Sequence, residues 1–255
     1  MIKYAEGAVN MRLRKLTGWM TATALTVMSC TGFTVLKEGY EAYQTAVEAE
    51  SLDEKIAKIQ AKRGYTRLSE LPDTYAQAVV SVEDHRFYNH FGLDPIAIGR
   101  AVVRDLKARR YVEGGSTITQ QLAKNLYFSQ EKQLSRKVAE VFLALDLEQK
   151  YSKDEILELY VNSIYYGDGY QNIGQASRGY FGKEPSKMSD YECTLLAGVP
   201  NAPSRYAPSK HPDLASKRQQ KVLSRMQVCG YLTKEETSEV NAQILATNLH
   251  FVGAN

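Results

Sequence analysis

Residues 75–92 read YAQAVVSVEDHRFYNHFG, and they place two adjacent acids, Glu83 and Asp84, directly after an apolar stretch with helical spacing. Burial removes the water that solvates a carboxylate, so an acid at the end of an apolar helix has a raised pKa. A raised pKa suits a general acid or base near neutral pH. The alternative is a surface cluster in which Asp84 pairs with Arg86 and His90 is simply packed. Taken alone, this segment favours that alternative.

The composition indicates one sizeable globular domain, because the 255-residue chain is 44% hydrophobic and carries a formal net charge of +3. Its lysines and arginines are spread along the chain, so we expect no nucleic-acid partner. The three cysteines, Cys30, Cys193 and Cys229, fit neither a disulfide framework nor the spacing of metal ligands.

Helical patterns dominate from Leu71 onward, and strand signals are few. Capping boxes predict three helix starts, at Ser152 with Glu155, Ser189 with Glu192, and Thr233 with Glu236. Turn residues concentrate at 114–115, 167–169 and 200–212. The sequence therefore predicts a mostly α-helical fold.

Residues 16–36, LTGWMTATALTVMSCTGFTVL, carry no charge and are long enough to cross a bilayer as one helix. A cleaved signal peptide is the alternative, but no small-residue cleavage site ends the run. Basic residues before the run place residues 1–15 in the cytoplasm and the remainder outside. We expect residues 37–64 to form a stalk or first helix and residues 65–255 to form the main domain.

Residues 114–125, GGSTITQQLAKN, lead two glycines into a serine and a threonine at a predicted helix start. Free backbone amides and hydroxyls at such a start can hold a phosphate oxygen, with Lys124 two turns further on. An ordinary helix N-cap is the alternative, and the spacing is not that of a P-loop.

Residues 134–140, LSRKVAE, open another helix. Arg136 and Lys137 lie four and three residues before Glu140, so the three side chains share one side of the helix. They form either a solvated ion-pair ladder or a diphosphate site with a carboxylate beside it.

Five strings occur in order along the chain: EDHRFYNHFG at 83–92, GGSTITQQ at 114–121, RKVAE at 136–140, KDEILELYVN at 153–162 and KRQQKVL at 217–223. Together they resemble the motifs of the peptidoglycan glycosyltransferases, glycosyltransferase family 51. The chain looks like a monofunctional form, similar to the transglycosylase domain of class A penicillin-binding proteins. It departs from the usual pattern at Lys217, where the family has an arginine.

The resemblance implies a lysozyme-like, two-lobed domain preceded by one transmembrane helix, with the catalytic domain outside the bacterial cell membrane. It implies inverting polymerisation of lipid II through β-1,4 bonds with release of undecaprenyl diphosphate. Glu83 would be the general base toward the acceptor 4-hydroxyl, and Glu140 would lie near the leaving diphosphate. The positions implied to bind substrate are Asp84, Phe87, His90, Ser116, Thr117, Gln121, Lys124, Asn125, Arg136, Lys137 and Lys153.

The implied partners are lipid II, the growing glycan strand, membrane lipid and other cell-wall synthesis proteins. A divalent cation, Mg²⁺ or Mn²⁺, is implied by the resemblance alone. Two other functions stay open: a membrane-anchored, lysozyme-like peptidoglycan hydrolase and a non-catalytic wall-binding module. A hydrolase has no need of GGSTITQQ or of the basic helix face, and a module has no need of the paired acids.

The segment from Phe87 to Val112 interleaves apolar residues with arginines and lysines. This mixture suits a surface that lies on anionic lipid. An amphipathic helix that packs into the core is the alternative. If the lipid interpretation holds, changing Val102, Val103 and Leu106 to serine weakens liposome binding.

Overall fold

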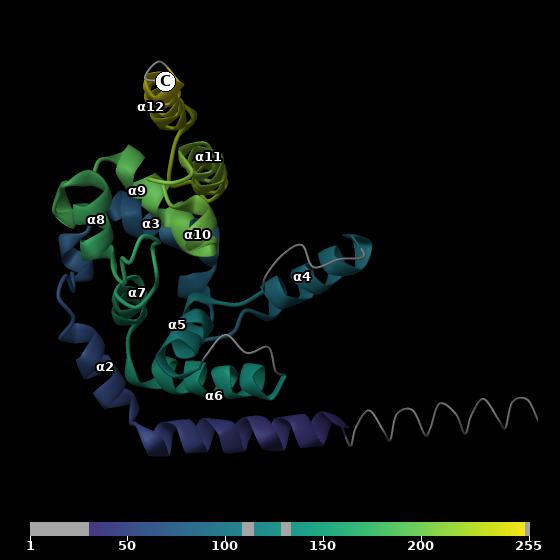
Figure 1. The fold of residues 1–255 in the computed structure, drawn as a ribbon. Coiled ribbons are helices and arrows are strands. Elements are labelled where there is room, and N and C mark those ends of the chain that lie inside the picture. Colours follow the sequence, from purple (N-terminus) through teal and green to yellow (C-terminus); the bar gives the residue numbers. More distant parts are fainter. Residues whose placement is uncertain (1–30, 109–114, 129–133, 253–255) are drawn as a thin grey trace, which may run out of the picture.

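The computed structural model describes residues 31–108, 115–128 and 134–252, and these residues are mostly helical (Figure 1). Their only extended pairing is an isolated bridge between Phe91 and Leu93. The predicted mostly α fold is therefore confirmed.

Of the predicted membrane span, residues 16–30 lie outside the described part of the chain, as do residues 1–15. Residues 31–36 belong to a helix that runs to residue 49. Among the described residues, no helix has the length and apolar character needed to cross a membrane.

After the helix of residues 31–49, the described helices follow in chain order: α2 (Leu52–Gln60), α3 (Asp73–Glu83), α4 (Pro95–Ala108), α5 (Ile118–Tyr127), α6 (Leu134–Lys150), α7 (Lys153–Val161), α8 (Ile173–Phe181), α9 (Asp190–Gly198), α10 (Pro203–Tyr206), α11 (Pro212–Val228) and α12 (Lys234–Val252). Short 3-10 turns lie at Leu68–Glu70, Phe87–Asn89, Pro185–Lys187 and Val199–Asn201. The three predicted capping boxes are confirmed, at the starts of α7, α9 and α12.

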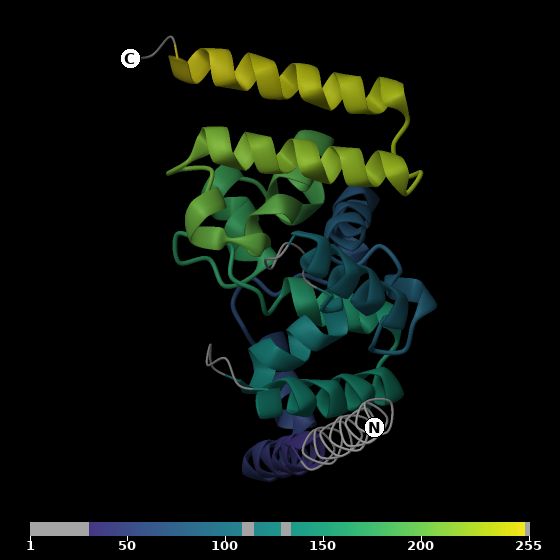
Figure 2. The same ribbon diagram turned by 90° about the vertical axis from the view of Figure 1, so that its right-hand side faces the viewer.

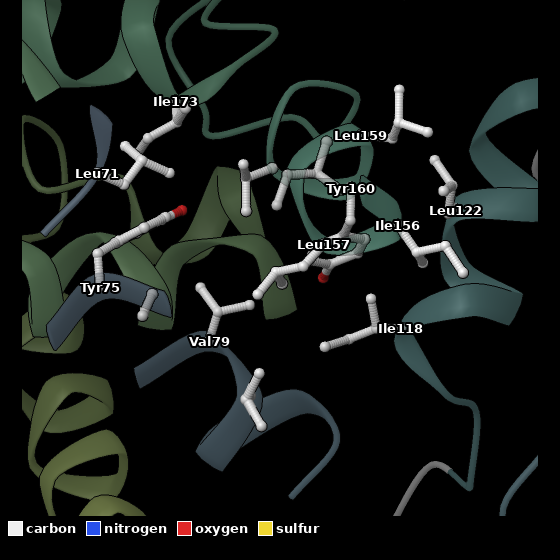
Figure 3. Close-up of a cluster of buried hydrophobic side chains, with 14 of the residues drawn as sticks. Leu71, Tyr75, Val79, Ile118, Leu122, Ile156, Leu157, Leu159, Tyr160 and Ile173 are labelled. Carbon is white, nitrogen blue, oxygen red and sulfur yellow. The ribbon is translucent and has the colours of Figure 1, made fainter. Parts of the chain in front are cut away.

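The main core lies where α3, α5, α7 and α9 meet, and Figure 3 shows part of it. In this cluster Val79 of α3 lies near Ile118 of α5 and Leu157 of α7, and Tyr75 of α3 lies beside Leu71. The α3 residues are four apart, the helical spacing that puts side chains on one face. Residues 52–60 of the predicted stalk add Leu52, Ile56 and Ile59 to the same core. The core thus holds the end of α3 and the start of α5 in fixed positions.

The helix of residues 31–49 packs closely on α6. A Cβ atom added at Gly39 would lie 2.4 Å from the Cβ of Val138, so only glycine permits this approach. Tyr40 and Tyr43 both stack against Phe142, and the Tyr43 hydroxyl donates to Asp146 at 2.6 Å. The helix that leads into the domain therefore rests on the helix that carries Glu140.

Two helices lie toward the outside of this arrangement. α4 projects away from the remaining helices (Figure 1). The apolar side chains along it include Ile96, Ile98, Val103 and Leu106, all exposed. α12 runs alongside α11 and closes a smaller cluster of Leu223, Val240 and Ile244 (Figure 2).

Candidate active site

An open cleft of about 1280 Å³ lies between the end of α3, α4, the start of α5, α10 and α11. Its walls carry eight lysines and arginines but three acids, and the cations are Arg100, Arg104, Lys124, Arg205, Lys217, Arg218, Lys221 and Arg225. The acids are Glu83, Asp84 and Asp94. A cleft with this balance attracts an anionic ligand.

Glu83 is the last residue of α3, and its carboxylate opens into this cleft. Oε2 accepts a hydrogen bond from Gln121 Nε2 at 3.1 Å, and Oε1 lies 3.5 Å from Arg218 Nη2. Burial raises the pKa of the Glu83 carboxyl, although Gln121 and Arg218 oppose the rise. The raised pKa expected from the apolar helix is thus present.

Oε1 of Glu83 accepts no hydrogen bond from the described residues. Glu83 lines the cleft and its pKa is raised, and both properties suit a general base.

Asp84 and His90 form a buried pair, with His90 Nε2 2.9 Å from Asp84 Oδ2. The same Asp84 oxygen accepts from the backbone N–H of Ile118 at 3.0 Å. Asp84 therefore ties the end of α3 to the first turn of α5, and that bond keeps Glu83 opposite Gln121. Asp84 lines the cleft, so its predicted substrate contact stays a prediction.

Thr117 is the N-cap of α5. An ordinary N-cap was the alternative to a phosphate-binding helix start. The hydroxyl of Thr117 accepts from Gln120 N at 3.1 Å and donates to the carbonyl of Gly92 at 2.6 Å. Thr117 N in turn donates to Gln120 Oε1. The expectation of free backbone amides here is wrong for residues 117, 118 and 120, because side chains of the protein already accept their hydrogen bonds. Gly114 lies outside the described residues.

Glu140 lies on α6 with its side chain 2% exposed. Arg136 Nε is 3.1 Å from Oε1, and Lys137 Nζ is 2.9 Å from Oε2. The Lys137 ammonium also donates to Ser116 Oγ at 2.9 Å, and Ser116 lines the cleft. Glu140 is absent from the described residues that line the cleft, so it is connected to it through Lys137 and Ser116.

The other residues predicted to bind substrate lie in the cleft wall, in the core or on the surface. Lys124 lines the cleft, whereas Asn125 is exposed on α5. Phe87 is fully buried, and Lys153 Nζ lies 4.5 Å from the centre of its ring. Lys153 also donates to Glu148 at 2.6 Å. Lys153 is thus connected to α5 through Glu148, which also accepts a hydrogen bond from Thr119.

Two residues of this site were not predicted as site residues. Arg218 contacts Glu83, and the hydroxyl of Tyr160 donates to Gln121 Oε1 at 3.2 Å. Tyr160 lies in the fourth sequence motif, residues 153–162, and Arg218 lies in the fifth, residues 217–223. Their membership of these motifs was the sequence signal that could have identified them. Their partners are separated from them by 39 residues or more, so spacing alone did not reveal the contacts.

A family profile and individual protein sequences both assign this chain to the same family. A family profile described as Transglycosylase matches residues 51–227. The chain is 43% identical to penicillin-binding protein 1F of Bacillus subtilis (strain 168) over 198 residues, which are 78% of this chain and 28% of that protein. It is 45% identical to penicillin-binding protein 1A of Aquifex aeolicus (strain VF5) over 178 residues, 70% of this chain and 24% of that protein. The chain thus spans about a quarter of the length of these relatives.

Proposed function

The chain belongs to the transglycosylase family, and we propose that its cleft polymerises lipid II into glycan strands of peptidoglycan. The observation that carries the proposal is Glu83, a largely buried carboxyl with a raised pKa, in the wall of a cleft dominated by cations. The base and the anion-binding wall are the two parts that transfer from a glycosyl diphosphate requires.

In the proposed reaction, Glu83 removes the proton from the 4-hydroxyl of the acceptor sugar. The acceptor oxygen attacks the anomeric carbon of the donor, and the bond from that carbon to the diphosphate oxygen breaks. The electron pair of that bond leaves with the lipid diphosphate. Attack from the opposite face inverts the anomeric centre and forms a β-1,4 bond.

The charge that develops on the leaving diphosphate needs fixed positive groups nearby. Lys124 lines the cleft, and the ammonium of Lys137 is held at Ser116, which also lines it. Glu140 keeps Lys137 and Arg136 in place through its two ion pairs. We propose that Glu140 acts on the leaving group through these cations.

The family also supports proposals about the setting of this chemistry. We propose a lysozyme-like, two-lobed domain, a single-pass membrane anchor within residues 16–36, and catalysis on the outer face of the bacterial cell membrane. The partners would be lipid II, the growing strand, membrane lipid and other cell-wall synthesis proteins.

The divalent cation stays a proposal that rests on the family. Among the described residues, no group of three His, Cys, Asp or Glu side chains is placed to hold a metal ion. Both oxygens of Glu140 already face cations of the protein. We therefore assign the cation no ligand in this chain and no step.

The test is incubation of the purified protein with lipid II in detergent, followed by separation of polymer from unreacted substrate. We expect polymer from the unchanged protein and a loss of at least about 100-fold in rate for Glu83→Gln, because a positioned general base contributes about that much or more. Glu184→Gln is the matched control, since Glu184 is a surface residue paired with Arg178.

The other functions are outcomes of the same assay. Cleavage of preformed glycan would support the hydrolase, and neither polymer nor cleavage would support the binding module. Full polymerase activity in Glu83→Gln would overturn the assignment of the base.

A further inference from the structure

The side chain of Gln121 lies between Glu83 and a residue with no assigned role, Tyr160. Gln121 Nε2 donates to Glu83 Oε2 at 3.1 Å, and Gln121 Oε1 accepts from the Tyr160 hydroxyl at 3.2 Å. The three residues come from α3, α5 and α7, so the tertiary fold brings them together.

A glutamine amide can present either its NH₂ group or its oxygen to a neighbour. An ionised carboxylate only accepts hydrogen bonds, so it is stabilised when the NH₂ group faces it. If the amide turned over, its oxygen would face Glu83, and that arrangement is favourable only with a protonated carboxyl.

Tyr160 decides between the two orientations. Its side chain is 1% exposed and stands among apolar residues of the core such as Leu157 (Figure 3). A buried hydroxyl without a partner costs free energy, so the O–H group of Tyr160 is held to the oxygen of Gln121. Burial also raises the pKa of Tyr160 well above 10, which keeps the phenol protonated and able to donate.

We propose that Tyr160 is a positioning residue that fixes the amide of Gln121 in the orientation that stabilises ionised Glu83. The inference rests on the proposed function of Glu83 as the base. It concerns a residue outside the cleft wall that would tune the protonation of that base without touching substrate.

The other charged groups around Glu83 do not substitute for this effect. Arg218 of α11 lies 3.5 Å from Oε1 and favours the ionised form, whereas Asp84 opposes it. Neither contacts the amide of Gln121 in any hydrogen bond of the described residues. Loss of the Tyr160 hydroxyl would leave both groups in place.

The test compares Tyr160→Phe with Tyr166→Phe. Tyr166 is an equally buried tyrosine whose hydroxyl pairs with that of Tyr75 at 2.5 Å, so the control loses a buried hydrogen bond without touching Gln121. We expect the acidic limb of the kcat–pH profile to move upward by about half a pH unit in Tyr160→Phe, the size that follows from one neutral hydrogen bond. KM for lipid II should stay unchanged, and the profile of Tyr166→Phe should match that of the unchanged protein.

A second readout needs no substrate. The carboxyl carbon of Glu83, labelled with ¹³C and assigned by its absence in Glu83→Gln, is titrated by NMR in each variant. An equal midpoint in Tyr160→Phe and Tyr166→Phe would overturn the proposal. If no variant polymerised lipid II while this midpoint still moved, the proposed function would fail and the positioning would stand.

Site-specific 3-fluorotyrosine at position 160 covers the case in which Tyr160→Phe does not fold. Fluorine strengthens the phenol as a donor and changes its volume little. We expect the Glu83 midpoint to move downward, and an unchanged or higher midpoint would contradict the proposal.

Discussion

Glu140 is buried and Glu83 is 10% exposed, and their surroundings differ. Glu83 has one amide donor and a guanidinium 3.5 Å away, and burial raises its pKa. Glu140 has an ion pair at each oxygen, at 3.1 and 2.9 Å. The first is suited to exchange a proton, and the second is suited to hold cations in place.

This difference predicts opposite effects of glutamine on stability. A carboxyl with a raised pKa in the folded state binds more protons there than in the unfolded state. Its contribution to the free energy of unfolding is therefore fully present below the unfolded pKa and is lost as pH rises through the folded pKa. Because glutamine does not ionise, we expect Glu83→Gln to gain thermal stability relative to the unchanged protein as pH rises from 4.5 to 7.5.

Glu140→Gln should instead lose about 2 kcal/mol at pH 7.5, since it removes the negative charge that both Arg136 and Lys137 contact on α6. Thermal unfolding of the three proteins at both pH values checks the pair of predictions. If the stability of Glu83→Gln changed with pH in the same way as that of the unchanged protein between pH 4.5 and 7.5, the prediction for Glu83 would be contradicted.

The start of α5 shows how one element depends on several others. Asp84 from the end of α3 accepts from its first N–H group, and Thr117 caps it while holding the carbonyl of Gly92. Glu148 of α6 accepts from Thr119 at 2.6 Å. α5 is therefore fixed by neighbours on different sides, which positions Gln121 and Lys124 toward the cleft.

The contact between the helix of residues 31–49 and α6 depends on a single glycine. A methyl group at Gly39 meets Val138, whereas one at Gly32 meets no atom within 4 Å. We expect Gly39→Ala to lower stability by about 1–3 kcal/mol through overpacking. Gly32→Ala should raise it by about 0.5–1 kcal/mol, the usual gain for alanine over glycine in a helix.

Thermal unfolding in detergent measures both alanine variants. The polymerisation rate should fall only for Gly39→Ala, because α6 carries Glu140 and Lys137. Equal stability of the two variants would show that the helix does not rest on α6 as described.

At the scale of the whole molecule, α4 projects from the other helices with several of its apolar side chains in solvent (Figure 1). Val103 is 51% exposed and Leu106 is 72% exposed, and Arg100, Arg104 and Lys107 lie on the same helix. A core helix would bury those apolar groups, so the lipid-facing interpretation of the sequence is favoured.

We therefore expect Val103→Ser with Leu106→Ser to weaken binding to vesicles that contain anionic lipid by about tenfold, from the apolar area lost to the bilayer. Ser238→Ala on α12 serves as the control. Co-sedimentation measures the fraction of protein bound to vesicles. Unchanged binding of the double variant would show that α4 does not contact the lipid.

Features set by neighbouring residues were predictable from the sequence. The capping boxes at Ser152, Ser189 and Thr233 depend on residues three apart, and the end of α3 at Glu83 follows from its apolar run. Contacts between distant elements were not predictable in this way. Arg218 reaches Glu83 across 135 positions of the sequence, and Tyr160 reaches Gln121 from a different helix.

The same reason explains why the hydroxyl of Thr117 and the amide of Ile118 were expected to be free. Their acceptors, Gly92 and Asp84, come from segments whose approach is decided by core packing.

The excess of cations in the cleft has a consequence for the end of the reaction. In the proposed reaction, the diphosphate that leaves the donor would carry more negative charge than it did while esterified, so the same eight lysines and arginines would hold it more strongly. Dissolved salt screens that attraction over about 8 Å at physiological ionic strength. Under the proposed function, the cleft walls that stabilise bond breaking would also retain the lipid diphosphate, so this charge would slow release of the product.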